Sequence, residues 1–175
     1  MSRIKSAWEL ALEKTEGMTF DEEKLKTDSL IKEGMALAGS YLANIDMSLD
    51  QLKQKLSQVK PEDMATFRKG MANVVISNIV LPQDALYSMR FERLCQVAGV
   101  LDSASGDSLM QLKEFLDGYL QQKEEFAQSI QQKLQADQVD PSQFSHIIQQ
   151  NLKRLDAQYQ ETLDRTKQTL ENALV

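Results

Sequence analysis

The chain has 175 residues, of which 42% are apolar and 26% charged, with a net charge of −6 and a pI of about 4.9. These values are typical of a folded protein and exclude general disorder. Because binding a phosphate backbone requires clustered Lys and Arg, we expect no nucleic-acid partner. The single cysteine, Cys95, excludes an internal disulfide and favours a reducing compartment, and its apolar neighbours predict a buried thiol.

The N-terminal segment is amphipathic, and the most apolar run of the chain is short. Residues 1–14, MSRIKSAWELALEK, lack the uninterrupted apolar core of a signal peptide. The run Val74–Leu81 contains Ser77 and Asn78 and is far shorter than the ~20 residues that span a bilayer. We therefore expect a cytoplasmic protein with no membrane partner.

Residues 1–104 predict a small body of about five helices, because apolar residues recur there at spacings of three and four. The first helix is predicted at 2–15, with Trp8 as a packing anchor, and the second at 19–44. Ser48 and Gln51 form a capping-box pattern, which predicts a short third helix to about residue 59.

Two prolines open the remaining helices of the predicted body. A helix from Pro61 to Leu81 is apolar on nearly every side at its end, so we expect it to be the most buried. The next helix opens at Pro82, and its expected inward residues are Leu86, Met89, Leu94, Val97 and Leu101. Ser103–Gly106 is rich in small residues and predicts the loop that ends the body.

Residues 107–175 predict two long amphipathic helices of roughly 30 residues each, joined by a tight turn at 138–141. Asp140 suits an N-cap and Pro141 the first position of the returning helix. A short connection makes such helices antiparallel neighbours. The expected fold is therefore all-α, a small helical body followed by a long antiparallel helical hairpin or coiled-coil arm.

The apolar stripes of this arm are the candidate interaction surface, because a two-helix hairpin buries only one stripe of each helix. We expect the arm to bind a second copy of the chain, giving a dimer, or another helical protein. The candidate residues are Phe115, Tyr119, Leu120, Phe126, Ile130, Ile148, Leu155 and Tyr159.

The residue pattern predicts no catalytic, cofactor or metal site. The one histidine, His146, has neither the partners of a zinc site nor a serine on a GxSxG turn. Neighbouring carboxylates such as Glu124 and Glu125 diverge on a helix and do not form a facing acid–base pair. The basic pairs Arg68-Lys69 and Arg90/Arg93 lie beside acidic residues and indicate surface ion pairs, with an anion site as the alternative.

Two segments resemble an uncharacterised bacterial all-helical family. They are residues 6–17, SAWELALEKTEG, and residues 151–163, NLKRLDAQYQETL. The order of an opening SAWE-type helix, a helical body and a long Gln-rich tail is also similar. The resemblance implies a bacterial cytoplasmic protein and supplies no activity, cofactor or site.

The sequence thus favours a non-enzymatic interaction or scaffold protein that acts through its arm. The alternative is a helical bundle that binds a small molecule or lipid, because methionines adapt to irregular ligands. Its pocket would be lined by Met35, Phe67, Met71, Met89 and Phe91. A third hypothesis, an enzyme that uses carboxylates alone, would need several acids in one cleft.

Overall fold

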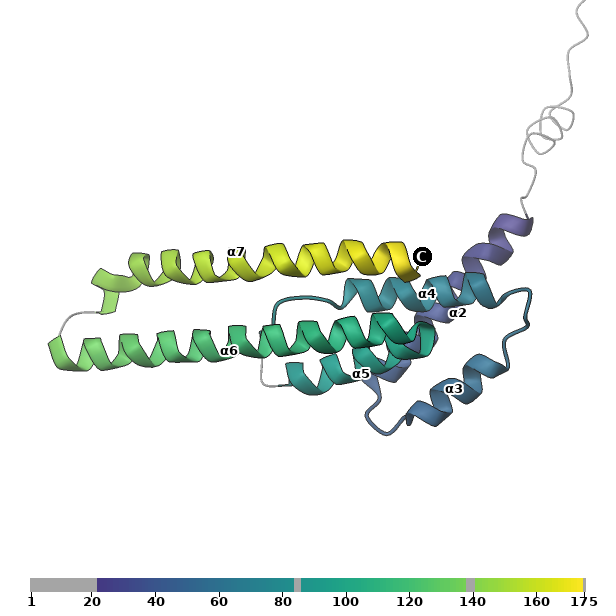
Figure 1. Cartoon of the computed structure of the whole chain (residues 1–175), viewed down its shortest axis with the longest axis horizontal. Coiled ribbons are helices and arrows are strands. Elements are labelled where there is room, and N and C mark those ends of the chain that lie inside the picture. Colours follow the sequence, from purple (N-terminus) through teal and green to yellow (C-terminus); the bar gives the residue numbers. More distant parts are fainter. Residues whose placement is uncertain (1–21, 84–85, 138–140, 175) are drawn as a thin grey trace, which may run out of the picture.

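The computed structural model describes residues 22–83, 86–137 and 141–174, so the helix predicted at 2–15 and the turn residues 138–140 lie outside it. All regular elements within the described ranges are α-helices, and the predicted all-α class is confirmed. None of these helices is both long and apolar enough to cross a membrane. The helices are α2 Glu22–Ala43, α3 Leu49–Ser57, α4 Met64–Ser77, α5 Tyr87–Leu101, α6 Ser103–Asp137 and α7 Pro141–Leu174 (Figure 1).

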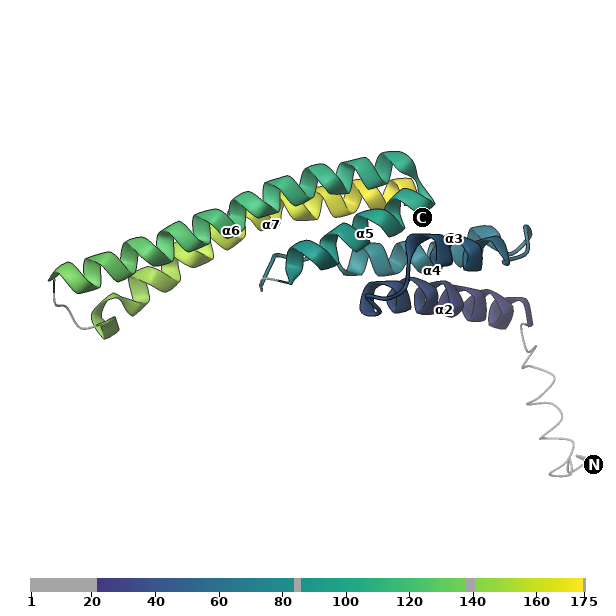
Figure 2. The ribbon, with the colours of Figure 1, turned by 90° about the horizontal axis from the view of Figure 1, so that it is seen from below.

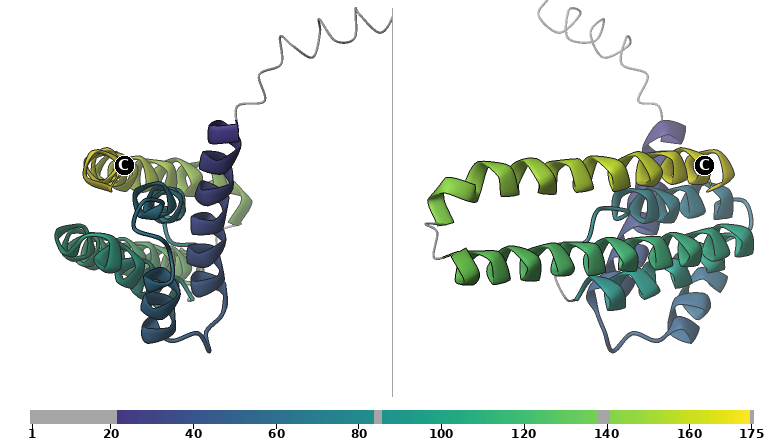
Figure 3. Two further views of the ribbon diagram at one scale, coloured as in Figure 1. Left: turned by 90° about the vertical axis from the view of Figure 1, so that its right-hand side faces the viewer. Right: turned by 60° about the vertical axis from the view of Figure 1, so that its left-hand side comes forward.

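The two longest helices, α6 with 35 residues and α7 with 34, lie side by side and run in opposite directions (Figure 1). The first half of α6 lies along α5, and the last half of α7 lies beside α4 (Figures 1 and 2). The other half of each helix extends beyond α2–α5. In Figure 3, left, α4, α6 and α7 are seen nearly end-on while α2 runs upright beside them.

Glycines allow α2 and α4 to cross with their backbones in contact. A Cβ added at Gly34 of α2 would lie 2.0 Å from the carbonyl oxygen of Phe67 in α4. A Cβ at Gly70 of α4 would lie 2.1 Å from the carbonyl oxygen of Ile31 in α2. Any larger residue at either position would push the two helices apart, so this crossing depends on both glycines.

The capping box predicted for the short helix α3 is confirmed. The Ser48 hydroxyl accepts a hydrogen bond of 3.2 Å from the Gln51 amide, and the Gln51 side chain accepts one of 2.9 Å from the Ser48 amide. Met47, just before this cap, and Leu52, in the first turns of the helix, are both buried. The start of α3 is thus determined by residues close together in the sequence.

The prolines do not open α4 and α5 as predicted. Pro61 lies in a turn ahead of α4, and α4 ends at Ser77 rather than Leu81 because the Asn78 side chain donates to the Val74 carbonyl at 2.8 Å. Helix α5 begins at Tyr87, five residues after Pro82.

The inner face of α5 also differs from the prediction. Leu86 precedes the helix and is 54% exposed, and Met89 is 42% exposed. Leu94, Val97 and Leu101 are buried as predicted.

The predicted loop at Ser103–Gly106 is wrong, because these residues form the first turn of α6. Asp102 alone separates α5 from α6, and its carboxylate accepts hydrogen bonds of 2.7 Å from the amide and the hydroxyl of Ser105. These bonds lower the pKa of Asp102. A Cβ at Gly106 would lie 2.8 Å from the Cα of Gly99, so close contact between α5 and α6 explains this glycine.

One continuous hydrophobic core joins α2, α3, α4, α5, the first half of α6 and the last half of α7. The predicted boundary between body and arm at 104–107 falls inside the first turns of α6. The largest fully buried side chains in this core include Tyr41, Met71, Ile79, Phe91, Leu94, Leu109, Leu116, Tyr119, Leu163 and Leu170.

Candidate functional site

The structure divides the eight candidate interaction residues into three groups along α6 and α7. Tyr119 and Tyr159 are buried in the core, and Leu120 and Leu155 are partly buried against it. Phe115 lies beside them and is 36% exposed. The remaining three are half-buried in the part of the two helices that extends beyond the body, namely Phe126, Ile130 and Ile148.

Three aromatic rings join α6 to α7 at the edge of the core. The Tyr159 ring lies 4.5 Å from the Phe115 ring and 5.1 Å from the Tyr119 ring, centroid to centroid. The Tyr119–Tyr159 pair is edge-to-face at 60°, an arrangement that aromatic quadrupoles favour. Tyr119 and Tyr159 are therefore contacts between α6 and α7 rather than surface offered to a partner.

Polar groups complete this aromatic junction. The Tyr119 hydroxyl donates to the Asp156 carboxylate at 2.7 Å, and the Lys123 ammonium donates to the same hydroxyl at 3.3 Å. Burial, together with the bond to Asp156, raises the pKa of Tyr119 to about 12. Asp156 and Lys123 were not predictable as partners of this tyrosine, because their significance depends on the pairing of α6 with α7.

Beyond this aromatic junction, the burial of side chains on α6 and α7 ends. Between Tyr119 and the end of α6, and between the start of α7 and Tyr159, no side chain that the structure describes is buried. The apolar positions there are only half-buried, and they include Phe126, Ile130, Ile148 and Leu152. We call this part of the molecule, residues 121–158, the distal segment.

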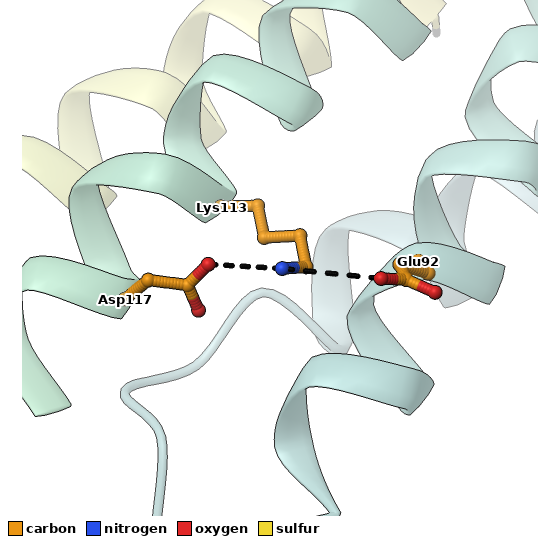
Figure 4. Close-up of polar contacts among 3 residues, drawn as sticks. All are labelled: Glu92, Lys113 and Asp117. Carbon is orange, nitrogen blue, oxygen red and sulfur yellow. Dashed lines mark hydrogen bonds and ion pairs between the residues drawn. The ribbon is translucent and has the colours of Figure 1, made fainter.

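An ammonium group bridges α5 and α6 (Figure 4). Lys113 of α6 lies 2.9 Å from the Asp117 carboxylate and 4.0 Å from the Glu92 carboxylate of α5. The hydrogen bond to Asp117 raises the pKa of Lys113, so the ammonium stays charged at neutral pH. Its side chain is 15% exposed, and the arrangement links two helices rather than presenting a base to solvent.

Cys95 is buried, as its apolar neighbours in the sequence predict, and His146 is exposed. Cys95 is buried and free, and burial raises the pKa of its thiol to about 11. A protonated, buried thiol is a poor nucleophile at neutral pH. The His146 side chain is exposed on α7. Among the described residues, no three His, Cys, Asp or Glu side chains form a group that could hold a metal ion.

The interpretation of Arg68 and Arg93 as surface ion pairs is wrong. Arg93 of α5 donates to the carbonyls of Tyr41 and Asn44 at the end of α2 and to the carbonyl of Met47 in the α2–α3 connection. Its guanidinium lies 3.9 Å from the Tyr41 ring centroid. The carbonyls of Tyr41 and Asn44 belong to the C-terminus of α2, which carries partial negative charge.

Arg68 does the same for α5, where it donates to the carbonyl of Leu101. Its acidic neighbour Asp63 pairs instead with Lys26 of α2, at 2.7 Å.

The methionine-lined pocket of the alternative hypothesis does not form as predicted. Met35 and Met89 are 41% and 42% exposed, so they do not enclose a pocket. Phe67, Met71 and Phe91 are buried in the core instead.

A protein-family model matches residues 53–172, which is more than half of the chain. The chain belongs to DUF6657, a family of unknown function. This confirms the expectation of an uncharacterised family. No curated protein and no solved structure matches the chain significantly.

The DUF6657 match contains α4, α5, α6 and nearly all of α7, and therefore both the aromatic junction and the distal segment. It does not include α2. Gly34, at the close crossing of α2 and α4, therefore lies outside the match. The carbonyls that Arg93 binds also lie outside it.

Proposed function

We propose that this chain is a non-enzymatic interaction protein that associates with a second copy of itself through an arm made by the distal segment of α6 and α7. The observation that carries the proposal is the end of burial at Tyr119 and Tyr159. Apolar residues at helical spacing continue past this point, from Phe126 to Ile130 on α6 and from Ile148 to Leu152 on α7, and no third helix among the described residues covers them.

A second pair of helices would cover these residues. Two packed helices shield only the stripe where they touch, and the flanks of that stripe remain open to water. In a four-helix bundle each helix contacts two neighbours, so the flanks are buried as well. Phe115, at the edge of the core, would gain cover in the same way.

The charge of the distal segment supports a second copy of the chain as its binding partner. Over residues 121–158 the sequence has five acidic and four basic residues, a net charge of −1, whereas the whole chain carries −6. Two such segments meet without strong like-charge repulsion. The same range has eleven glutamines, whose amides both donate and accept hydrogen bonds and so pair with themselves.

Sedimentation equilibrium of the full chain at tens of micromolar tests the proposal, with a dimer expected. Ile130→Glu places a charge on the half-buried stripe and should shift the mass towards the monomer. Gln131→Glu, at the neighbouring exposed position, adds the same charge outside the stripe and should leave the dimer intact. A monomeric wild type, or equal effects of the two variants, would overturn self-association through this surface.

A shortened chain tests whether the distal segment carries all binding. Stopping the chain at Gly106 would remove Leu109, Leu116 and Leu163 from the core, so that variant would unfold. Replacing residues 124–153 by a short glycine-serine linker instead keeps Tyr119, Asp156 and the core. The shortened chain should be a folded monomer, as judged by circular dichroism and sedimentation.

The alternative to a second copy as the partner of the distal segment is another helical protein. Affinity capture from the native cell with the full and shortened chains separates the two cases. Recovery of the same second protein with the full chain alone, from a wild type that is monomeric by itself, would replace self-association by hetero-association. We place this interaction in the bacterial cytoplasm, supported by the resemblance of residues 6–17 and 151–163 and by the single free thiol of Cys95.

A further inference from the structure

The contacts between α6 and α7 give the level of each residue along the distal segment. The Tyr119 hydroxyl bonds to Asp156, and the Tyr119 ring lies against the Tyr159 ring. Because the helices run in opposite directions with the same rise per residue, ten residues forward on α6 are level with ten residues back on α7 (Figure 1). Ser129, ten residues after Tyr119, is therefore level with residues 146–149, which include Ile147.

Ser129 and Ile147 also lie on the same flank of the hairpin. Each comes one position before a half-buried residue, Ser129 before Ile130 and Ile147 before Ile148. Two antiparallel helices that face each other are related by a two-fold rotation about an axis perpendicular to the plane of the hairpin. This rotation keeps each side of the plane on itself, so positions that precede the facing stripe fall on one side. We call this side the Ser129 flank.

The Ser129 flank has an exposed apolar residue at its centre. Ile147 is 52% exposed, and no other large apolar side chain described in the distal segment is as open. Ser129 beside it is small, and its hydroxyl donates to the Phe126 carbonyl of its own helix at 2.8 Å. A helix that covered this flank would bury Ile147 and leave the Ser129 hydroxyl with its partner.

Opposite charges lie symmetrically about Ser129 on the edge of α6. Glu125 precedes Ser129 by four residues and Lys133 follows it by four, and both side chains are exposed. A spacing of four residues keeps all three positions on one edge of the helix. When two such edges pack antiparallel with Ser129 at the centre, Glu125 of each copy faces Lys133 of the other.

The other two-fold arrangement has both bodies at the same end and places α6 against α7 of the second copy. At the levels given above, Glu125 would then face Asn151, and Ile147 would face Ser129. This arrangement forms neither the ion pairs nor an apolar contact at Ile147. The charge and the exposed apolar residue of the flank therefore favour the antiparallel arrangement.

The extent of the distal segment also fits antiparallel arms. Its part of α6 runs from 121 to Asp137, and Ser129 is the midpoint. A second copy centred there covers this part of α6 and stops where the body begins. The rest of each chain carries a net charge of −5, the difference between −6 for the chain and −1 for the distal segment. Antiparallel arms keep these like charges at opposite ends.

We infer that the second copy binds antiparallel on the Ser129 flank, with a two-fold axis that passes close to Ser129 and Ile147. Ile147 then contacts its own counterpart, and Glu125 pairs with Lys133 twice across the interface. This inference rests on the proposed self-association and specifies its geometry.

Cysteine cross-linking of the full chain tests this geometry. Ser129→Cys and Ile147→Cys should each give a cross-linked dimer with a short bismaleimide on a denaturing gel, because the axis brings each position next to its counterpart. Gln149→Cys, exposed on the other flank of α7, is the matched control and should run as a monomer. The wild type should do the same, since Cys95 is buried.

The outcomes separate the geometry from self-association itself. A cross-link that forms only when Ser129→Cys and Ile147→Cys are mixed would place α6 against α7 of the second copy and refute antiparallel arms. A dimer in sedimentation that neither single variant cross-links would refute the geometry alone. A monomeric wild type would overturn the proposed function and this inference together.

Charge reversal tests the ion pairs. Lys133→Glu should raise the dissociation constant of the dimer about tenfold, because a glutamate would face Glu125 at both ends of the interface. Adding Glu125→Lys to the same chain reverses both charges and should restore the wild-type dissociation constant in sedimentation. A double variant as weak as Lys133→Glu would contradict the pairing.

Discussion

Replacing Gly34 by alanine should destabilise the protein, although alanine favours helices more than glycine does. The new Cβ would lie 2.0 Å from the Phe67 carbonyl oxygen and 3.2 Å from the Met71 amide nitrogen. Because Cβ contacts under 3.0 Å are essentially never seen, α2 and α4 would have to separate by about 1 Å.

The net effect is the difference between two opposing terms. Overpacking costs about 1–3 kcal/mol, and the upper end applies here because the obstacle is backbone, which has no alternative rotamer. The gain in helix propensity is about 1 kcal/mol. We therefore expect the free energy of unfolding to fall by about 2 kcal/mol.

Urea unfolding followed by far-ultraviolet circular dichroism measures this change. Gly39→Ala is the matched control, since it makes the same substitution in the same helix where no atom lies within 4 Å. It should raise stability by up to about 1 kcal/mol. Equal unfolding midpoints for the two variants would refute the close crossing of α2 and α4.

Three further predictions concern single side chains. Arg93→Met should lower the free energy of unfolding by about 2 kcal/mol in the urea assay, because three carbonyls at the end of α2 and in the α2–α3 connection lose their charged donor. An unchanged midpoint would contradict this role. Stability should fall as pH rises from 10.0 to about 12, since native Tyr119 keeps a proton that the unfolded chain releases. Tyr119→Phe should flatten that part of the pH profile. Cys95, buried with a raised pKa, should react with Ellman's reagent only on unfolding, and rapid reaction of the native protein would disprove its burial.

The glycines show how far sequence reasoning reaches. Gly106 stands in a run of small residues that is typical of a loop, yet it lies in the first turns of α6. The reason for a glycine at position 106 is its contact with Gly99, seven residues earlier. The Cβ of a larger residue at 106 would lie 2.8 Å from the Cα of Gly99. Both a loop and a close helix contact select glycine, so composition does not distinguish them.

The candidate site shows the same limit. The apolar stripes of α6 and α7 were predictable because they repeat every three or four residues. The sequence did not show that Tyr119 and Tyr159 would be buried while Phe126 and Ile148 stay half-buried. That difference depends on where the body ends along the two helices. Nor did periodicity show that Met35 and Met89 would be exposed, because an amphipathic face is often wider than the contact it makes.

Local sequence alone determined the all-helical class and the start of α3, because helical periodicity and capping act between residues three or four positions apart. Tertiary structure decided the close crossing of α2 and α4, the contact of Gly106 with Gly99, and the role of Arg93, which lies 52 residues from the Tyr41 carbonyl that it binds. Such contacts depend on how the helices pack against one another, and short-range patterns in the sequence carry no record of that packing.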